Sequence, residues 1–295
     1  MTQVLVIGVA VVDFVFALDQ LPDRAMKYRA KTAEIVGGGC GASAAVAIAR
    51  LGGNAILGAR LGDDVIGDLI LRDLESEGVD LSWMQITKGA ASSFSSVYVD
   101  QSGERQIVNL RGSGLIESTD WIDNAPRSDV VLADTRWSEG AIRALELAQR
   151  WNVPGVVDAE APMDEEVLRL ASHVAFSRDG LLSFSSAKDL QSALTDADRR
   201  LPGWVCVTDG QNGTYHIENG TISQVPAFRV IIKDTLGAGD VWHGAFTLAL
   251  ADGQNEPEAM RYANAAAAMK CASFGGRKGC PYKDELARFL KENTV

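Results

Sequence analysis

The sequence is poor in the residues from which metal sites and disulfide frameworks are built. Its 295 residues include only four cysteines and three histidines. The cysteines are scattered, and no two of them form a Cys-x-x-Cys pair. This distribution argues against a structural zinc site and favours a reduced, cytoplasmic setting. The four cysteines are Cys40, Cys206, Cys271 and Cys280.

Positive charge and long apolar runs are also scarce. Lysine and arginine number 28 against 39 acidic residues, and the net charge of −11 argues against nucleic-acid or anionic-membrane binding. No stretch approaches the roughly 20 apolar residues that span a bilayer. The apolar run at 4–18 has no basic region before it and is interrupted by Asp13, so it does not resemble a signal peptide. We expect a soluble protein whose partners are small molecules.

Two common nucleotide-binding motifs are missing or misplaced. The chain has no Gly-Lys-Ser/Thr sequence, which excludes a P-loop. Gly37 to Ala42 can be read as a dinucleotide fingerprint, but that motif should directly follow the first strand, and the run Val4 to Ile7 ends about thirty residues upstream. Glycines this dense still indicate a ligand close to the backbone, with a purely structural turn as the alternative.

Strand-like and helical stretches alternate along most of the chain. Short apolar runs such as 4–7, 130–132 and 204–207 are typical of buried parallel strands. This alternation predicts an α/β fold with a mainly parallel sheet. At 295 residues two domains are feasible, but without a linker or repeat we expect a single domain over 1–295. Helices are expected at 42–51, 139–151, 164–171, 187–199, 257–274 and 283–291.

Two segments depart from this alternation. The region 10–35 mixes apolar and charged residues without a helical period. The runs 94–100 and 105–110 are β-rich and are joined by a turn containing Gly103. Together they predict a small β-sheet, from about 11–36 and 92–112, that lies beside the main sheet and acts as a lid.

The strongest local signal for chemistry is the run from Asp234 to Asp240. Gly237 and Gly239 flank Ala238, and an apolar helix-like stretch follows. Free N–H groups at a helix N-terminus attract anions. A carboxylate in such a place is costly unless it has a role, and abstracting a proton from an attacking hydroxyl is one. We therefore predict phosphoryl transfer, with the loop holding charge and Asp240 as the base.

A second polar stretch, Val207 to Gly213, follows a predicted strand. Ligands of open α/β sheets bind at the carboxyl ends of strands. An ordinary strand-to-hairpin connection is the alternative reading.

These motifs together resemble the ribokinase-like (PfkB) family of carbohydrate kinases along nearly the whole chain. The resemblance implies a three-layer sandwich with a central mainly parallel sheet and a small β lid, and it implies ATP and Mg²⁺ as cofactors. It leaves open a monovalent cation such as K⁺. The motifs are Gly38-Gly39 opening an alanine-rich helix, Gly62-Asp63-Asp64-x-x-Gly67, Thr208-x-Gly210-x-x-Gly213 and Asp234-Thr235-x-Gly237-Ala238-Gly239-Asp240.

The resemblance also implies roles for single residues. Asp240 is expected to be the catalytic base, and the N–H groups of Gly237, Ala238 and Gly239 to form the anion hole for the γ-phosphate. The expected sugar contacts are Asp13, Gly38, Gly39 and Ser43, and the expected nucleotide contacts are Thr208, Gly210, Gly213 and Asn264.

Three departures from the family pattern stand out. Ser43 occupies a position that is often asparagine, and Leu236 one that is often threonine. The Asn-x-x-Glu motif that the family links to magnesium is absent from 176–180, so the metal ligands stay unassigned.

The choice of sugar depends on Lys27, Asn109 and Arg136. Two cations and an amide suit a fixed anion such as a sulfonate or a phosphate, although each alone could be a solvated or packing residue. Their surroundings, Leu21-Pro22, Gly103-Glu104-Arg105-x-Ile107-x-Asn109 and Leu132-Ala133-Asp134-x-Arg136-Trp137, resemble the sulfofructose kinase branch of the family. That resemblance implies phosphorylation of 6-deoxy-6-sulfofructose at O1, with these three residues holding the sulfonate.

Other interpretations stay open. Arg105 and Arg111 could join the anion site, but surface positions suit them better. A neutral-sugar or nucleoside kinase of the fructokinase or ribokinase type is the main alternative, and a non-catalytic sugar-sensing protein is a remote one. Exposed lid strands could pair between subunits, which predicts a homodimer.

Overall fold

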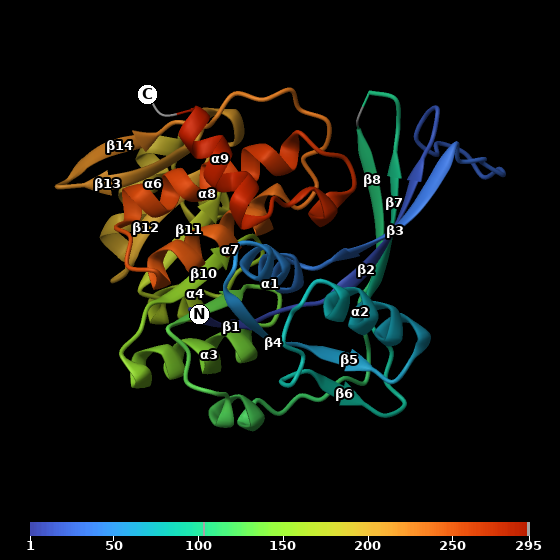
Figure 1. The fold of residues 1–295 in the computed structure, drawn as a ribbon, viewed down its shortest axis with the longest axis horizontal. Helices are drawn as coiled ribbons and strands as arrows, with labels where there is room; N and C mark the ends of the chain where they lie inside the picture. The colour runs from blue at the N-terminus through green and yellow to red at the C-terminus, as the bar shows by residue number, and fades with distance from the viewer. Residues whose placement is uncertain (103, 294–295) are drawn as a thin grey trace.

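An eight-stranded sheet forms the centre of the molecule in the computed structural model, which describes residues 1–102 and 104–293 (Figure 1). Six strands run parallel, and the two at one edge pair antiparallel. The predicted mainly parallel sheet is therefore confirmed. In spatial order the strands are β14 (Thr221–Val225), β13 (Thr214–Glu218), β12 (Trp204–Thr208), β11 (His173–Ser177), β10 (Gly155–Ala159), β9 (Val130–Asp134), β1 (Gln3–Ile7) and β4 (Asn54–Gly58).

Helices cover both faces of this sheet, which completes the predicted three-layer sandwich. Separate apolar clusters lie against the two faces, and the strands between them are apolar almost throughout, as expected of a sheet buried on both sides. One layer holds α1 (Cys40–Arg50), α7 (Ala238–Ala251), α8 (Glu256–Cys271) and α9 (Lys283–Glu292). The other holds α3 (Ser138–Trp151), α4 (Glu165–Leu170), α5 (Arg178–Phe184) and α6 (Leu190–Arg200).

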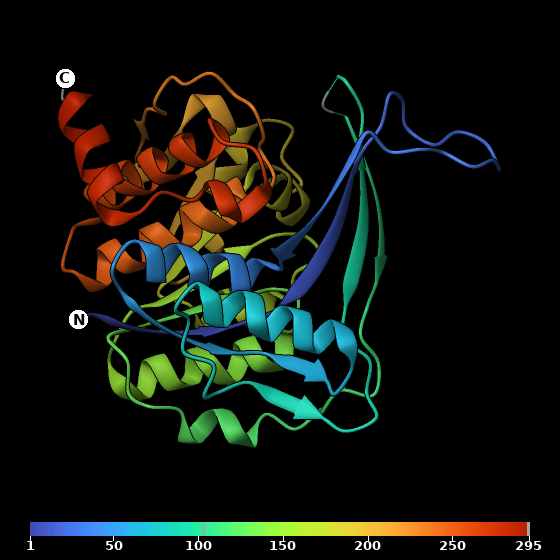
Figure 2. The same cartoon turned by 45° about the vertical axis from the view of Figure 1, so that its right-hand side comes forward.

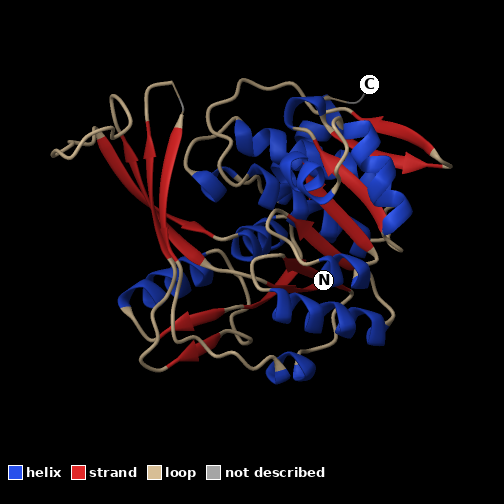
Figure 3. Ribbon diagram, turned by 180° about the vertical axis from the view of Figure 1, so that it is seen from behind, coloured by secondary structure: helices blue, strands red, loops and turns tan. Residues whose placement is uncertain are grey.

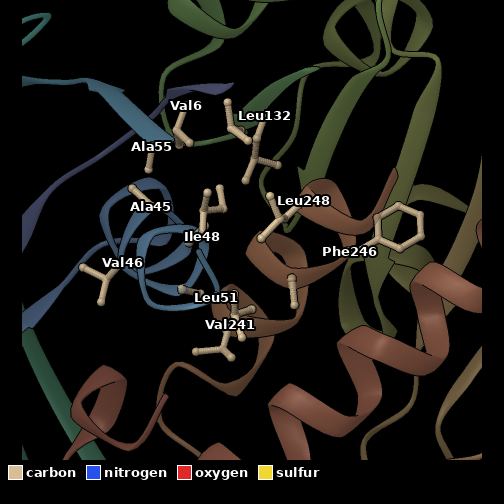
Figure 4. Packing of buried hydrophobic residues seen from close by; sticks show 14 of the residues in the cluster. Val6, Ala45, Val46, Ile48, Leu51, Ala55, Leu132, Val241, Phe246 and Leu248 are labelled. Atoms are coloured by element: carbon tan, nitrogen blue, oxygen red, sulfur yellow. The ribbon is translucent and has the colours of Figure 1, made fainter. Parts of the chain in front are cut away.

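The packing of α1 against α7 positions the site. Both helices are rich in alanine, and Figure 4 shows Ile48 of α1 and Leu248 of α7 in this packing. Small side chains allow close approach, since a side chain added at Gly244 of α7 would come within 2.5 Å of Ala44 O of α1. Each helix begins at a glycine loop that the sequence analysis singled out, after Gly39 and after Gly237.

A separate four-stranded sheet, which we call the lid sheet, stands beside the main body in Figures 1 and 2. Seen from behind, its strands are clearly apart from those of the central sheet (Figure 3). The predicted small β-sheet is confirmed, although Gly103, in its predicted turn, lies outside the described residues. In spatial order the strands are β3 (Thr32–Gly38), β2 (Val11–Ala17), β7 (Phe94–Val99) and β8 (Arg105–Leu110).

Some elements differ from the predictions. Strand β4 ends at Gly58, and a separate strand β5 (Arg60–Gly62) pairs with β6 (Gln85–Thr87) in a two-stranded sheet that was not predicted. Helix α5 was also missed, because its seven residues are too few to show a helical period. Helix α2 (Val65–Ser76) follows the Gly62-Asp63-Asp64 motif, and the Asp64 side chain caps it by accepting from Gly67 N at 2.7 Å. Within the two described ranges, every helix falls short of the length and apolar character needed to cross a bilayer.

Candidate active site

The predicted anion site lies at the N-terminus of α7. Gly237 directly precedes the helix at φ 75°, a left-handed conformation that glycine adopts without strain. A side chain added at Gly239 would meet no described atom within 4 Å, so the backbone there is open. Ala238 and Gly239 line a cavity of about 620 Å³. The N–H group of Ala238 donates to Thr235 O at 3.2 Å, whereas the N–H groups in the first turn of a helix that lack a helical partner are available to a phosphate in this cavity.

Asp240 lies in the first turn of α7, immediately beside these N–H groups. Burial raises its pKa to about 7, the neighbouring carboxylate of Asp158 acts in the same direction, and His243 opposes both. A carboxylate with a pKa near the working pH is suited to accept a proton from a hydroxyl. The structure thus gives the predicted base a suitable environment.

The groups that surround this base were not predicted from the sequence. Asp134 is the last residue of β9, Asp158 is the last but one of the neighbouring β10, and the two are paired in register. Asp134 accepts hydrogen bonds from Val9 N at 2.8 Å, Gly41 N at 3.0 Å and Arg136 N at 3.0 Å. It therefore ties the end of β1, the start of α1 and the residue predicted to bind the substrate anion into one frame. The available signal was an acidic residue at the carboxyl end of each strand.

Asp158 and His243 form a second buried contact behind the base. His243 Nε2 lies 3.5 Å from Asp158 Oδ1 and 3.2 Å from the carbonyl of Ala175, and Nδ1 lies 2.8 Å from the carbonyl of Gly239. Burial lowers the pKa of His243 and raises that of Asp158 well above its ordinary value. These contacts fix the first turn of α7 against strands β10 and β11.

Cys40 completes this cluster. Its sulfur, a carboxylate oxygen of Asp158 and one of Asp240 all lie within 4.8 Å of one another. Mg²⁺ prefers oxygen ligands and is usually held through substrate phosphates, whereas a thiol suits softer metals. The set therefore does not fit Mg²⁺, and the sequence motif that would supply its ligands is replaced by Ser177, which caps α5 through Gly180 N. We assign magnesium no protein ligand.

The predicted nucleotide contacts converge on the cavity at α7. Thr208, Gly210, Gly213 and Asn264 all line it. The amide of Asn264 is already engaged, since Oδ1 accepts from Thr214 and from Trp242 Nε1, both at 2.8 Å, and Nδ2 donates to Val225 O at 3.0 Å. Asn264 therefore shapes the wall of the cavity and has no free amide group for the nucleotide.

Two predicted sugar contacts share one row of the lid sheet. Asp13 pairs with Ser95, and Ser95 pairs with Asn109, across strands β2, β7 and β8. Residues directly opposite each other in a sheet share a face. Asn109 Nδ2 donates to Ser95 Oγ at 3.1 Å. Burial raises the pKa of Asp13, while a hydrogen bond from Ser95 opposes the rise.

This row of residues faces the segment 234–240, which we call the catalytic loop. Val15, two residues beyond Asp13 on the same strand face, lines a cavity of about 300 Å³ together with Asp234 and Thr235. Gly38 adjoins the row, since a side chain at this position would come within 2.4 Å of Asp13 Oδ2. Its neighbour Gly39 precedes α1 at φ 90°, and Ser43 is buried in the first turn of that helix. Of these sugar-contact candidates, Asp13 and Gly38 therefore belong to the lid sheet and Ser43 to α1, and the two parts meet at the start of α1.

The predicted anion contacts are only partly brought together. Arg136, at the end of β9, donates to Ala161 O at 2.9 Å and to the Glu160 carboxylate, and it lines a cavity of about 500 Å³. Arg111, for which a surface position was preferred, lines the same cavity from the end of β8. Lys27 is exposed on the segment between β2 and β3, which projects away from the main body in Figure 2.

Comparison with known proteins agrees with this geometry. The model of the pfkB family of carbohydrate kinases matches residues 1–283. A ribokinase of Bacillus subtilis is 27% identical over 98% of this chain and 100% of its own length. An ATP-dependent ribose-1-phosphate kinase of Halopiger xanaduensis is 30% identical over 99% of each chain. The crystal structure of a putative ribokinase from Agrobacterium tumefaciens superposes with a TM-score of 0.92 at 33% identity, covering 99% of this chain and 98% of that one.

Proposed function

The chain belongs to the pfkB family of carbohydrate kinases, which are ATP-dependent phosphotransferases, and from this premise we propose that its acceptor is an anionic ketose. The best candidate is 6-deoxy-6-sulfofructose, phosphorylated at O1 during sulfoquinovose breakdown. The observation that carries the proposal is the pair of arginines, Arg136 after β9 and Arg111 directly after β8 of the lid sheet, that line one cavity, which Asp164 and Glu165 also line.

The contacts of Arg136 leave room for a second anion. A guanidinium has five donors, and the described partners of Arg136 are Ala161 O, the Glu160 carboxylate and the Cys40 side chain. The Glu160 contact orients the guanidinium, and a sulfonate could bind the donors that remain. Asn109 lies on the face of the lid sheet that is turned toward the catalytic loop, where its amide could contact the sugar. This arrangement supports recognition of a charge at one end of a sugar whose other end reaches Asp240.

One relative makes an anionic acceptor reasonable for this fold. The Halopiger xanaduensis protein, 30% identical to this chain, is by its name a kinase of a phosphorylated sugar. Its name supports the class of acceptor, while the resemblance of Lys27, Asn109 and Arg136 to the sulfofructose kinase branch supports a sulfonate over a phosphate.

In the proposed reaction the residues at the start of α7 divide the work. The N–H groups of Gly237, Ala238 and Gly239 bind the γ-phosphate, and Asp240 accepts the proton of the sugar hydroxyl as its oxygen attacks phosphorus. The new O–P bond forms while the bond between the γ-phosphorus and the bridging oxygen breaks, and ADP leaves. Such transfers rely mainly on positioning and electrostatic stabilisation. No protein ligand is assigned to magnesium, which would be held by the nucleotide phosphates and would there neutralise phosphate charge.

A neutral-sugar or nucleoside kinase is the second candidate function. It is favoured by the ribokinase names of the relatives, and Asp13 with Gly38 could hold sugar hydroxyls without any anion. A non-catalytic sugar sensor has less support, because Asp240 and the open backbone at Gly239 are retained.

We also propose a cytoplasmic homodimer that forms through the lid sheet. Strand β8 ends the lid sheet, and its six residues are all exposed. Its apolar residues Ile107, Val108 and Leu110 are more than half exposed, and an exposed apolar edge strand is a ready site for pairing with a second chain. The four cysteines are free, which suits a reducing compartment.

An ADP-release assay with MgATP and a panel of acceptors tests the proposed function. The panel contains sulfofructose, fructose 6-phosphate, fructose, ribose and adenosine. We expect the highest kcat/KM with sulfofructose and a lower value with fructose 6-phosphate. Preference for ribose or adenosine would establish the second candidate instead, and no ADP release with any sugar would favour the sensor.

A further inference from the structure

Lys270 is a fully buried lysine in the last turn of helix α8. Its exposed fraction is 0%, and it follows the alanine-rich stretch 263–268 of α8. Buried lysines are rare unless their charge is paired. Here the ammonium group donates to the main-chain oxygen of Asp234 at 2.8 Å and to its Oδ2 at 3.0 Å. The partner is the first residue of the loop that leads to the anion site.

Asp234 is held from several directions. Its Oδ1 accepts from Leu236 N at 2.8 Å, and its Oδ2 accepts from Gly276 N at 2.8 Å as well as from Lys270. Its own N–H group donates to Cys271 O at 3.2 Å. Burial raises the pKa of Asp234, but these hydrogen bonds outweigh burial and leave the pKa below its ordinary value. The start of the loop is therefore fixed as an anion between α8 and the segment after it.

We propose that Lys270 is a positioning residue whose ammonium group serves as an internal monovalent cation for the anion-binding loop. A carboxylate and a carbonyl oxygen converge on its nitrogen, and these are the hard oxygen ligands that a potassium or sodium ion would take. The loop from Asp234 to Gly237 then keeps the shape that presents its N–H groups to a phosphate. The chain consequently needs no monovalent cation from solution.

The geometry favours an ammonium group over a bound ion at this place. Lysine supplies its charge on the same chain, so no ion has to be captured or ordered. Lys270 and Asp234 are 36 positions apart in the sequence, so their contact requires α8 to pack against α7. The loop therefore takes the shape that binds phosphate only when the helices have packed correctly.

Nucleotide binding tests the proposal without knowledge of the acceptor sugar, so its failure differs from failure of the proposed substrate. The probe is the Mg²⁺ complex of the non-hydrolysable ATP analogue AMP-PNP, titrated by calorimetry in potassium chloride or in N-methylglucamine chloride. We expect the dissociation constant of the unmodified protein to be the same in both salts within about twofold. A loss of binding without potassium would overturn the proposal.

Two substitutions at position 270 sharpen the test. Lys270→Ala removes the charge and leaves space, so we expect binding in N-methylglucamine to weaken at least about tenfold and potassium to restore most of it, because charged hydrogen bonds are lost. Lys270→Met fills the space without a charge, so potassium should not restore binding. Lys233→Ala removes an exposed charge next to Asp234 and should leave binding unchanged in both salts.

The remaining outcomes are decisive. Unchanged binding by Lys270→Ala in N-methylglucamine, or weakened binding that potassium does not restore, would overturn the role of Lys270 as a cation. A thermal melt of each variant in both salts distinguishes a change in the shape of the loop, which leaves the fold intact, from unfolding of the protein. If both variants at position 270 unfold, the comparison of salts with the unmodified protein decides.

Discussion

The catalytic loop and the lid sheet are built in opposite ways. Asp234 receives four hydrogen bonds, and Asp240 is enclosed by buried groups. Strand β8 of the lid sheet is exposed along its whole length, and Arg105 joins it to the loop through a 2.9 Å hydrogen bond to Thr235. In the proposed function, the phosphate is bound where the backbone is fixed by buried hydrogen bonds. Recognition of the sugar is shared with the lid sheet, whose edge strand β8 is exposed.

The first test removes the base from the fixed region. Asp240→Asn keeps the size of the side chain, so the fold and the binding of MgATP should persist. Turnover should fall by at least about 10²-fold, because a general base contributes on that scale. Steady-state kcat and calorimetry on the same preparation measure both. Near-normal turnover would remove Asp240 from its assigned role.

The second test separates the two regions through the substrate anion. Arg136→Met should raise the KM for sulfofructose about 30-fold, because it leaves a sulfonate without its charge partner. The KM for fructose, measured as a control, should change little. Arg111→Met, on the lid side of the same cavity, should have a smaller effect of the same kind. Equal losses on both sugars would contradict the sulfonate assignment.

The third test uses pH. Burial and Asp158 raise the pKa of Asp240 to about 7, so kcat/KM should fall about tenfold for each pH unit below that value as the base becomes protonated. Replacement Asp158→Asn removes a like charge, which lowers the pKa of Asp240 and should shift the acid limb to lower pH. A pH profile of kcat/KM checks this, and a shift in the opposite direction would exclude the proposed effect of Asp158.

The smallest effect on catalysis is expected at the edge of the lid sheet. Val108 is 60% exposed, and Val108→Glu should convert the proposed homodimer to a monomer while changing kcat only a few-fold. Sedimentation velocity measures the change. Val65→Glu, at a 75% exposed position on α2, is the matched control and should stay dimeric. A monomeric unmodified protein would remove the dimer proposal.

Much of the architecture could be predicted because its signals are local. Apolar strands alternating with helices predicted the central sheet, and the lack of a helical period at 10–35 predicted the lid sheet. Helix α5 was missed because seven residues show no period, and the pairing of β5 with β6 was missed because neither three-residue strand stands out in the sequence.

By itself the sequence determined the chemistry at Gly237 to Asp240, because a left-handed glycine, the free N–H groups of one helical turn and a carboxylate in that turn all belong to one short segment. Only the tertiary structure decided what surrounds that segment. Asp158 lies near Asp240 because of the order of the strands. Arg111 and Arg136 line one cavity because of the position of the lid sheet, and Lys270 contacts Asp234 because of helix packing. Contacts between residues so far apart depend on strand order, register and packing, which no local pattern records.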